Sequence, residues 1–436
     1  MSTTRRFWPP SLTSQFLICP VPFHVDSYRG CVHNCTYCFA RDFTTFHRNL
    51  KAGTLGGKDE PTLDVLNAAS PEKKAAEPPR PFTALDGNDP EGFAKWCRKA
   101  KDKKPALTDS AAYYFHENVP LKFGATSDPC PVAELKEGIS RAMLRTLKDL
   151  GHPTEIQTKN PAVLERVLDG MEGANFTISV SLIMVDEAKM RIVEPGAPTP
   201  RARLEAIRRL VDRGFPVFVK CQPALYPMIL EEVEPLVEAV AAAGCWAFQM
   251  EGLKVRVTMP KEEKAIFAAV ERVGGTPPGM TALDFYRSHG VRTGSDYELR
   301  HDLKVEYHRK GRELTHAKGL VYFAADNDCA RWGDSPECCG TEKLRDYRTL
   351  RLNLRTIAHD TREALDREAG PTTVSDLAPW HDDLSDVVID FTRNDRLRGK
   401  TIFEAVREEV EKNGLEQATG KAPIEEGDGI LSSFFG

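Results

Sequence analysis

The chain has 436 residues, of which 41% are hydrophobic and 28% are charged, as is typical of a globular protein with a buried core. The net charge of -5 argues against a large sequence-independent affinity for nucleic acid, which requires an excess of Lys and Arg. No apolar run is long enough to cross a bilayer, and prolines interrupt the apolar patch near the N-terminus. We therefore expect a cytoplasmic protein without a membrane partner.

Residues 1–50 contain an irregular segment, a short strand within FLICPVPFHV and a loop with three cysteines. Residues 51–111 are rich in Lys, Pro, Glu, Gly and Ala, which indicates an insertion. We expect this insertion to be helical around Pro90–Lys101 and a loop elsewhere. Its run of charges is interpreted as a solvated surface.

Residues 112–255 alternate between predicted strands and helices. The predicted strands lie in VPLKFGA, TEIQTK, FTISVSLI, FPVFVKCQPAL and CWAFQMEGLKV. Apolar strands that alternate with helices over short loops predict a parallel sheet covered by helices. Together with the strand before the cysteine loop they give about six strands, so the fold class is α/β and we expect a partial (β/α)6 barrel. An open doubly wound sheet is the alternative, but no Gly-x-Gly-x-x-Gly follows a strand to support a dinucleotide site.

After residue 255 the alternation stops. Residues 256–415 are predicted to form a mainly helical C-terminal domain that carries a second group of cysteines. Residues 416–436 are predicted to be a loose tail.

The loop after the first strand contains Cys31, Cys35 and Cys38 in a C-x3-C-x2-C pattern. Three thiolates on one tight loop can hold three irons of a [4Fe-4S] cluster, which leaves the fourth iron open to a small molecule. The alternative is a structural zinc site, for which His33 or His24 would have to supply a further ligand.

This motif resembles the radical S-adenosylmethionine (SAM) superfamily. Further stretches resemble its spore photoproduct lyase branch, whose poorly assigned relatives are often labelled DNA repair photolyases. They are Gly124-Ala-Thr-Ser-Asp128, Thr158-Lys159, Ile178-Ser-Val-Ser181 and the segment from Glu194-Pro-Gly to Arg208. The resemblance implies that SAM chelates the open iron and is cleaved reductively to a 5′-deoxyadenosyl radical, which abstracts hydrogen from a substrate.

The resemblance also implies roles for individual residues. Cys31, Cys35 and Cys38 match the cluster ligands, and Tyr37 matches the aromatic residue beside the adenine. The residues that match polar contacts to SAM are Thr126, Lys159, Ser179 and Arg203, with Lys159 and Arg203 near the SAM carboxylate. The alternative is that these residues are ordinary surface charges and backbone hydrogen-bond partners.

Two positions depart from the lyase pattern. Ala125 stands where the lyase has a hydrogen-donating cysteine, and Phe39 stands where it has a tyrosine. The resemblance therefore predicts the SAM chemistry and does not predict the lyase's own reaction. Whether the chain is a lyase or an oxidoreductase stays open.

A second group of cysteines, Cys329, Cys338 and Cys339, lies outside the predicted barrel. It could ligate an auxiliary iron–sulfur cluster, or zinc together with His308 or His316. One of its thiols, or Cys130, could instead donate hydrogen to a product radical. The alternative is a set of inert thiols, as we expect for the structural cysteines Cys19, Cys97, Cys221 and Cys245.

We expect a radical SAM enzyme that takes electrons from a reductant such as flavodoxin or ferredoxin. Its substrate could be nucleic acid, a peptide or a small metabolite, and Arg41, Arg48, Lys51 and the basic run at 97–104 could contact phosphates. The rival hypothesis is a non-catalytic protein that binds zinc or senses redox state through an iron–sulfur cluster.

Overall fold

The computed structural model describes residues 5–13, 15–40, 85–256, 260–277, 279–293, 296–360, 374–390 and 396–418. Arg41, Arg48 and Lys51, the first part of the expected insertion and the end of the expected tail lie outside the described residues.

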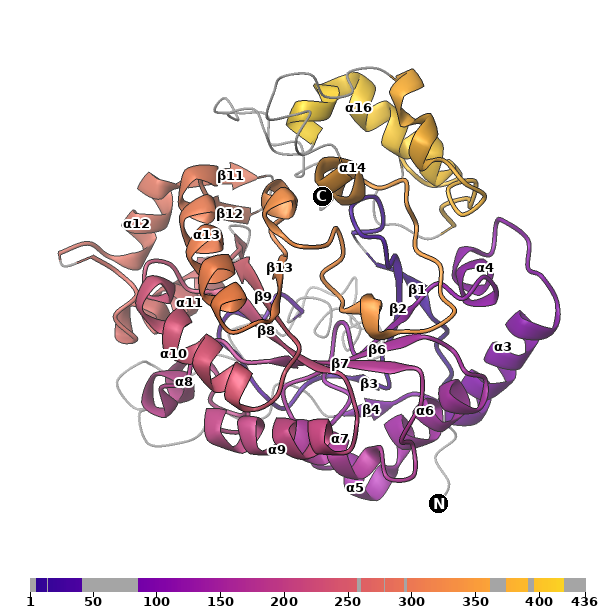
Figure 1. The fold of residues 1–436 in the computed structure, drawn as a ribbon, viewed down its shortest axis with the longest axis horizontal. Coiled ribbons are helices and arrows are strands. Elements are labelled where there is room, and N and C mark those ends of the chain that lie inside the picture. Colours follow the sequence, from indigo (N-terminus) through magenta and orange to yellow (C-terminus); the bar gives the residue numbers. More distant parts are fainter. Residues whose placement is uncertain are drawn as a thin grey trace, which may run out of the picture.

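The centre of the molecule is one curved sheet of eight strands (Figure 1). In spatial order the strands are β1 (Ser11–Leu12), β2 (Phe23–Val25), β5 (Leu121–Phe123), β6 (Thr154–Thr158), β7 (Phe176–Ser181), β8 (Val217–Ala224), β9 (Ala247–Gly252) and β13 (Val321–Ala324). β1 is antiparallel to β2, and every later neighbour is parallel. Within the described residues β1 and β13 are not paired with each other, so the sheet is a partial barrel, as predicted.

The six expected barrel strands are β2, β5, β6, β7, β8 and β9, and a seventh parallel strand joins them. This strand, β13, lies beyond the expected boundary at residue 255 and pairs with β9. The four residues of β13 are too few for an alternating pattern to identify a strand. Because 68 residues separate β13 from β9, the sequence does not indicate that the two strands pair.

Helices cover the outer face of the sheet (Figure 1). They are α6 (Ile139–Asp149), α7 (Pro161–Val167), α9 (Pro200–Asp212), α10 (Ile229–Ala242) and α13 (His301–Ala317). Helix α9 shows why they form where they do. Thr199 caps its first turn by accepting a hydrogen bond from Ala202 N at 3.3 Å, Pro200 occupies the first helical position, and Gly214 ends it with a positive φ of 84°.

The expected insertion contains β4 (Asp86–Gly87) and α3 (Pro90–Asp102), so a helix lies where Pro90–Lys101 was expected to be helical, and α4 (Ser110–His116) begins at the end of the insertion. Asp89 caps α3 by accepting from Glu91 N at 3.1 Å. β4 pairs with β3 (Tyr28–Arg29), which leads directly into the cysteine loop.

The C-terminal part is mainly helical, as expected, and also forms a small sheet. Its helical segments are α11 (Pro260–Arg272), α12 (Ala282–His289), α13, η1 (Asn327–Trp332), η2 (Thr341–Lys343), α14 (Leu354–Asp360), η3 (Val374–Trp380) and α16 (Ile402–Ala418). The small sheet has the order β10 (Val255–Arg256), β12 (Asp296–Leu299) and β11 (Gly290–Thr293). None of the described helices is long and apolar enough to span a membrane.

Candidate functional site

The cysteine loop begins directly after β3, near the carboxyl end of the first parallel strand, β2. Gly30 and Asn34 have positive φ angles of 97° and 51°, which allow the chain to turn tightly between the cysteines. Cys35 is buried and Cys31 and Cys38 are half-buried, and none of them is in a disulfide. Burial and the neighbouring acid Asp128 raise the pKa of Cys31 to about 12, and the Cys38 thiol adds to this shift. Three reduced thiols on one turn fit the three-cysteine donor set of an open [4Fe-4S] cluster.

The segment after helix α8 (Glu187–Val193) holds this loop through its backbone. Thr36 N donates to Val193 O at 2.9 Å, and Gly196 N donates to His33 O at 2.9 Å. A Cβ atom on Gly196 would lie 2.4 Å from Val32 O, so no larger residue fits there without moving the loop. The Glu-Pro-Gly motif is thus the platform on which the cysteine loop rests.

Glu194 lies at the centre of a charged group that we call the Glu194 cluster, formed with Tyr37, Lys159 and Arg203. Its carboxylate accepts hydrogen bonds from the Tyr37 hydroxyl and from Arg203, and Lys159 Nζ lies 3.1 Å from Oε1. Burial alone would raise the pKa of Glu194, but Arg203 and Lys159 outweigh it and lower the pKa to about 2.

The two cations of the Glu194 cluster differ in their access to solvent. The Arg203 side chain is fully buried and also donates to Ser181 O at 2.7 Å and Pro198 O at 2.9 Å. Its guanidinium nitrogens therefore all have protein partners. The Lys159 side chain is 16% exposed, and Nζ lies 3.3 Å from the Tyr37 hydroxyl oxygen and 5.4 Å from the ring centre. Lys159 is thus the cation of this cluster that a ligand can reach.

Two further aspartates connect the loops at this end of the barrel. Asp128 accepts from Lys159 N at 2.6 Å and the Thr158 hydroxyl at 2.8 Å, and its Oδ2 lies 3.0 Å from His33 Nε2. Asp26, which follows β2, accepts from Thr126 N at 3.0 Å and from the Thr126 hydroxyl. Asp128 thus links the cysteine loop to the carboxyl end of β6, and Thr126 is held by Asp26.

Ser179 lies in a different layer of the barrel. It is fully buried on β7, and its hydroxyl donates to Glu155 Oε1 at 2.7 Å. The same oxygen lies 2.5 Å from Lys220 Nζ on β8. The structure therefore groups Ser179 with a buried ion pair rather than with the Glu194 cluster.

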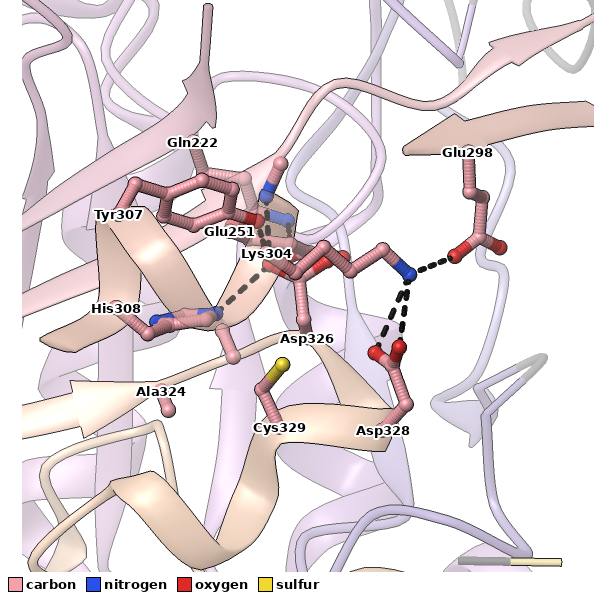
Figure 2. A network of polar contacts seen from close by, with 12 residues as sticks. Gln222, Glu251, Glu298, Lys304, Tyr307, His308, Ala324, Asp326, Asp328 and Cys329 are labelled. Carbon is pink, nitrogen blue, oxygen red and sulfur yellow. Dashed lines mark hydrogen bonds and ion pairs between the residues drawn. The ribbon is translucent and has the colours of Figure 1, made fainter. Parts of the chain in front are cut away.

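A second polar network lies at the carboxyl ends of β8, β9 and β13 (Figure 2). Asp326 accepts from Gly252 N at 2.8 Å and from the Tyr307 hydroxyl, and lies 3.0 Å from His308 Nε2. Lys304 bridges Glu298, at 2.8 Å, to both oxygens of Asp328, at 3.2 Å. Sequence reasoning named only His308 of this network, as a possible zinc ligand, because most of the other members come from α13, β12 and η1, outside the predicted barrel.

The structure divides the second group of cysteines. Cys329 lies beside this network, with His301 Nδ1 at 3.9 Å, and the ligand atoms of His301, Asp328 and Cys329 all lie within 4.8 Å of one another. Cys338 and Cys339 instead pack with Cys19 at the opposite end of the strands. The expected auxiliary site of Cys329 and Cys338 is therefore not assembled, because the loop after η1 carries Cys338 away from Cys329.

Cys130 is also fully buried. Its N–H donates to Asp128 at 2.9 Å and its carbonyl accepts from Asn160 at 2.9 Å. The backbone of Cys130 therefore fixes the loop after β5, and its thiol is buried.

Comparison with known proteins identifies the class. Residues 25–240 match the radical SAM superfamily. Residues 25–240 thus form a radical SAM domain, as the cysteine motif predicted.

The curated relatives come from mycobacteria. The chain is 28% identical over 243 residues to uncharacterized proteins of Mycobacterium tuberculosis and Mycobacterium bovis, an alignment that covers 54% of this chain and 60% of each relative. The chain thus spans less than two thirds of the length of the relatives it matches.

Among solved structures, the chain is similar to a spore photoproduct lyase variant with bound AdoMet and dinucleoside spore photoproduct. The TM-score is 0.46 at 14% identity, over 72% of this chain and 79% of that one. It is also similar to the radical S-adenosylmethionine methyltransferase TsrM from Kitasatospora setae, with a TM-score of 0.37 at 12% identity, over 79% of this chain and 62% of that one.

Proposed function

We propose that this chain is a radical SAM enzyme of the spore photoproduct lyase-like branch, with Cys31, Cys35 and Cys38 as the ligands of a [4Fe-4S] cluster. One observation supports this best: three reduced thiols lie on a loop held against the Glu194 cluster at the carboxyl ends of parallel strands. When bound, the cluster and SAM would supply the electron transfer and the 5′-deoxyadenosyl radical that abstracts hydrogen from substrate.

The side chains around the loop would bind and orient SAM. Lys159 is the partly exposed cation and would pair with the SAM carboxylate. Tyr37, which lies against Lys159, would pack beside the adenine, and Thr126 would offer a hydroxyl oriented by Asp26. Ser179 would act as a positioning residue deeper in the barrel, through its hydrogen bond to Glu155. Arg203 would act as a positioning residue that holds Glu194, because its nitrogens already have protein partners.

Electron paramagnetic resonance tests this proposal. Anaerobically reconstituted, dithionite-reduced protein should show a [4Fe-4S] signal that changes when SAM is added. Cys35→Ser should lose the signal, whereas Cys245→Ser, which changes a buried thiol just before β9, should keep it. Lys159→Ala should keep the cluster. The SAM concentration needed for the spectral change should rise at least about tenfold, which corresponds to a loss of about 1.4 kcal/mol in binding free energy.

The rival function makes the opposite prediction. A non-catalytic zinc or redox-sensing protein would bind no SAM, and its metal signal would be the same in Lys159→Ala. Protein that takes up zinc and no iron, or a cluster signal that SAM leaves unchanged, would overturn the enzyme proposal.

The substrate class is open to a direct test. Nucleic acid, a peptide and a small metabolite remain candidates, and a reductant such as flavodoxin or ferredoxin would supply the electron. Nucleic acid alone predicts binding that weakens steeply with salt, because bound Lys and Arg displace counterions from phosphates. Among the candidate hydrogen donors, Cys130 and Cys329 lie at the same end of the strands as the cysteine loop, whereas Cys338 and Cys339 lie at the opposite end.

A further inference from the structure

Three thiols from distant segments meet at the amino ends of the barrel strands, away from the cysteine loop. Cys19 lies in the turn before β2, and Cys338 and Cys339 lie between η1 and η2. The next residue, Gly340, has a φ of 63° and packs so closely that a Cβ atom would lie 2.7 Å from the Phe218 ring. The close packing against β8 fixes the position of the two adjacent thiols.

A lysine points at this group. Lys122 on β5 donates from Nζ to Cys19 Sγ at 3.1 Å. A second ammonium, on Lys220, has its pKa raised by Glu155 and then by Cys339 and Cys338, although burial opposes the shift. Positive charges beside thiols oppose the binding of a metal cation and favour the thiolate. The surroundings therefore point to thiol chemistry rather than to an auxiliary metal centre.

The Cys19 thiol donates to Val21 O at 3.2 Å. The neighbouring Cys339 side chain, followed by the charge of Lys122, nevertheless lowers the pKa of Cys19 to about 6, although burial opposes the shift. Burial raises the pKa of most other thiols in the chain, as at Cys97, Cys221 and Cys245. Cys338 is only half-buried, so small molecules can approach the group along its side.

We propose that Cys19, Cys338 and Cys339 form a redox-active thiol site, in which Cys19 and Cys339 are oxidised to a disulfide by a small hydroperoxide. This site goes beyond the proposed SAM reaction and does not depend on it. The Cys19 thiolate would attack one peroxide oxygen, the O–O bond would break, and the other oxygen would leave as water after taking a proton. The Cys339 sulfur would then displace hydroxide from the Cys19 sulfenic acid, which leaves as a second water with the thiol proton.

Overall, two thiols and one hydrogen peroxide give one disulfide and two waters. A small dithiol such as dithiothreitol returns the disulfide to two thiols and is itself oxidised to a cyclic disulfide. Large oxidants are excluded, because Cys19 is 3% exposed and Cys339 is 2% exposed.

Peptide mapping tests the site directly. Reconstituted full-length protein is treated with one equivalent of hydrogen peroxide, blocked with an alkylating agent and digested with trypsin. Trypsin places Cys19 in peptide 7–29, and Cys338 and Cys339 in peptide 332–343, with no other cysteine in either. We expect these two peptides to be joined through Cys19 and Cys339, assigned by fragmentation, and separated again by dithiothreitol.

Variants keep the test specific. Lys122→Met should slow formation of the bridge at least about tenfold at pH 7, because less Cys19 is then thiolate. Lys148→Met, a control on the surface of α6, should leave the rate unchanged. The proposal is overturned if both peptides stay fully alkylated while peroxide is consumed, or if Lys122→Met bridges at the wild-type rate. Since the wild-type map alone decides the first outcome, a variant that fails to fold does not weaken the test, and SAM binding plays no part in it.

Discussion

Glu194 shows how one carboxylate can organise a site. Its two oxygens take contacts from a tyrosine, a lysine and an arginine, and it adjoins the backbone that supports the cysteine loop. The resemblance to radical SAM enzymes pointed to Lys159 and Arg203 as partners of the SAM carboxylate. A family pattern identifies cations but not the protein acids that neutralise them, so Glu194 could not be assigned from sequence.

We predict that Glu194→Gln destabilises the fold. It leaves the fully buried Arg203 without its anion, and breaking a buried ion pair by removing one partner costs about 3–5 kcal/mol. Urea denaturation measures the free energy of unfolding, and iron analysis measures cluster content, which should also fall. Glu205→Gln, an exposed change on the same helix α9, is the control. Equal stability of the two variants would contradict this account of Glu194.

Glu337 is predicted to make stability depend on pH. Burial, together with the charge of Glu342, raises its pKa from the ordinary 4.5 to about 8, and its Oε2 has no hydrogen-bond partner. The folded state then holds the proton more tightly than the unfolded state. The stability that this group contributes is therefore full below about pH 4.5 and is lost as the pH rises to about 8.

The matched experiment uses Glu337→Gln, which is neutral at every pH. Urea denaturation between pH 5.5 and 8.5 should show a smaller fall in the free energy of unfolding than wild type shows. The exposed change Glu234→Gln should behave like wild type. If the free energy of unfolding of Glu337→Gln falls with pH as steeply as that of wild type, another group is responsible for the pH dependence.

At the scale of elements, local patterns were predicted best. The cysteine loop, the strand–helix alternation and helix α9 depend on neighbours in sequence, and all were expected where they lie. The separation of Cys329 from Cys338, and the packing of Cys339 with Cys19, depend on contacts between segments that are far apart in sequence. Spacing within a short cysteine-rich segment cannot show that its two ends lie at opposite ends of a sheet.

The contact between Gly196 and the cysteine loop gives a prediction at this scale. In Gly196→Ala the new methyl group would lie 2.4 Å from Val32 O and 2.8 Å from His33 O, and backbone atoms cannot move aside as side chains do. We expect the loop to shift and iron content after reconstitution to fall to less than about half, while circular dichroism stays near wild type.

Gly319→Ala is the control, since its Cβ atom would meet nothing within 4 Å, although the positive φ of Gly319, 71°, disfavours a side chain. That variant should lose about 1 kcal/mol of stability and keep its iron. Full iron content in Gly196→Ala would mean that the loop does not need this support.

At the scale of the whole molecule, the barrel is completed by distant segments. β13 extends the sheet beyond β9, and the C-terminal part bonds to the N-terminal segment through Leu350 N to Pro20 O at 3.0 Å and Leu354 N to Leu17 O at 3.1 Å. The sheet crosses the expected boundary of the C-terminal domain at residue 256, because β13 belongs to the sheet.

We therefore predict that a chain ending at residue 256 does not fold as an independent barrel. It would expose the edge of β9 and the apolar residues that β13 and α13 cover, which favours aggregation. Gel filtration and thermal denaturation measure this outcome, with the full chain as the control. A monomeric truncated protein with a cooperative transition and a bound cluster would contradict it.

The place of β13 in the sheet also concerns the order of synthesis. The cysteine loop is made near the start of the chain, whereas the last parallel strand follows only at residues 321–324. At about 5–20 residues per second, roughly 15–60 s separate the two on the ribosome. During that interval the nascent chain carries Cys31, Cys35 and Cys38 beside an unfinished sheet, so the proposed cluster would have a complete barrel around it only after β13 has been made.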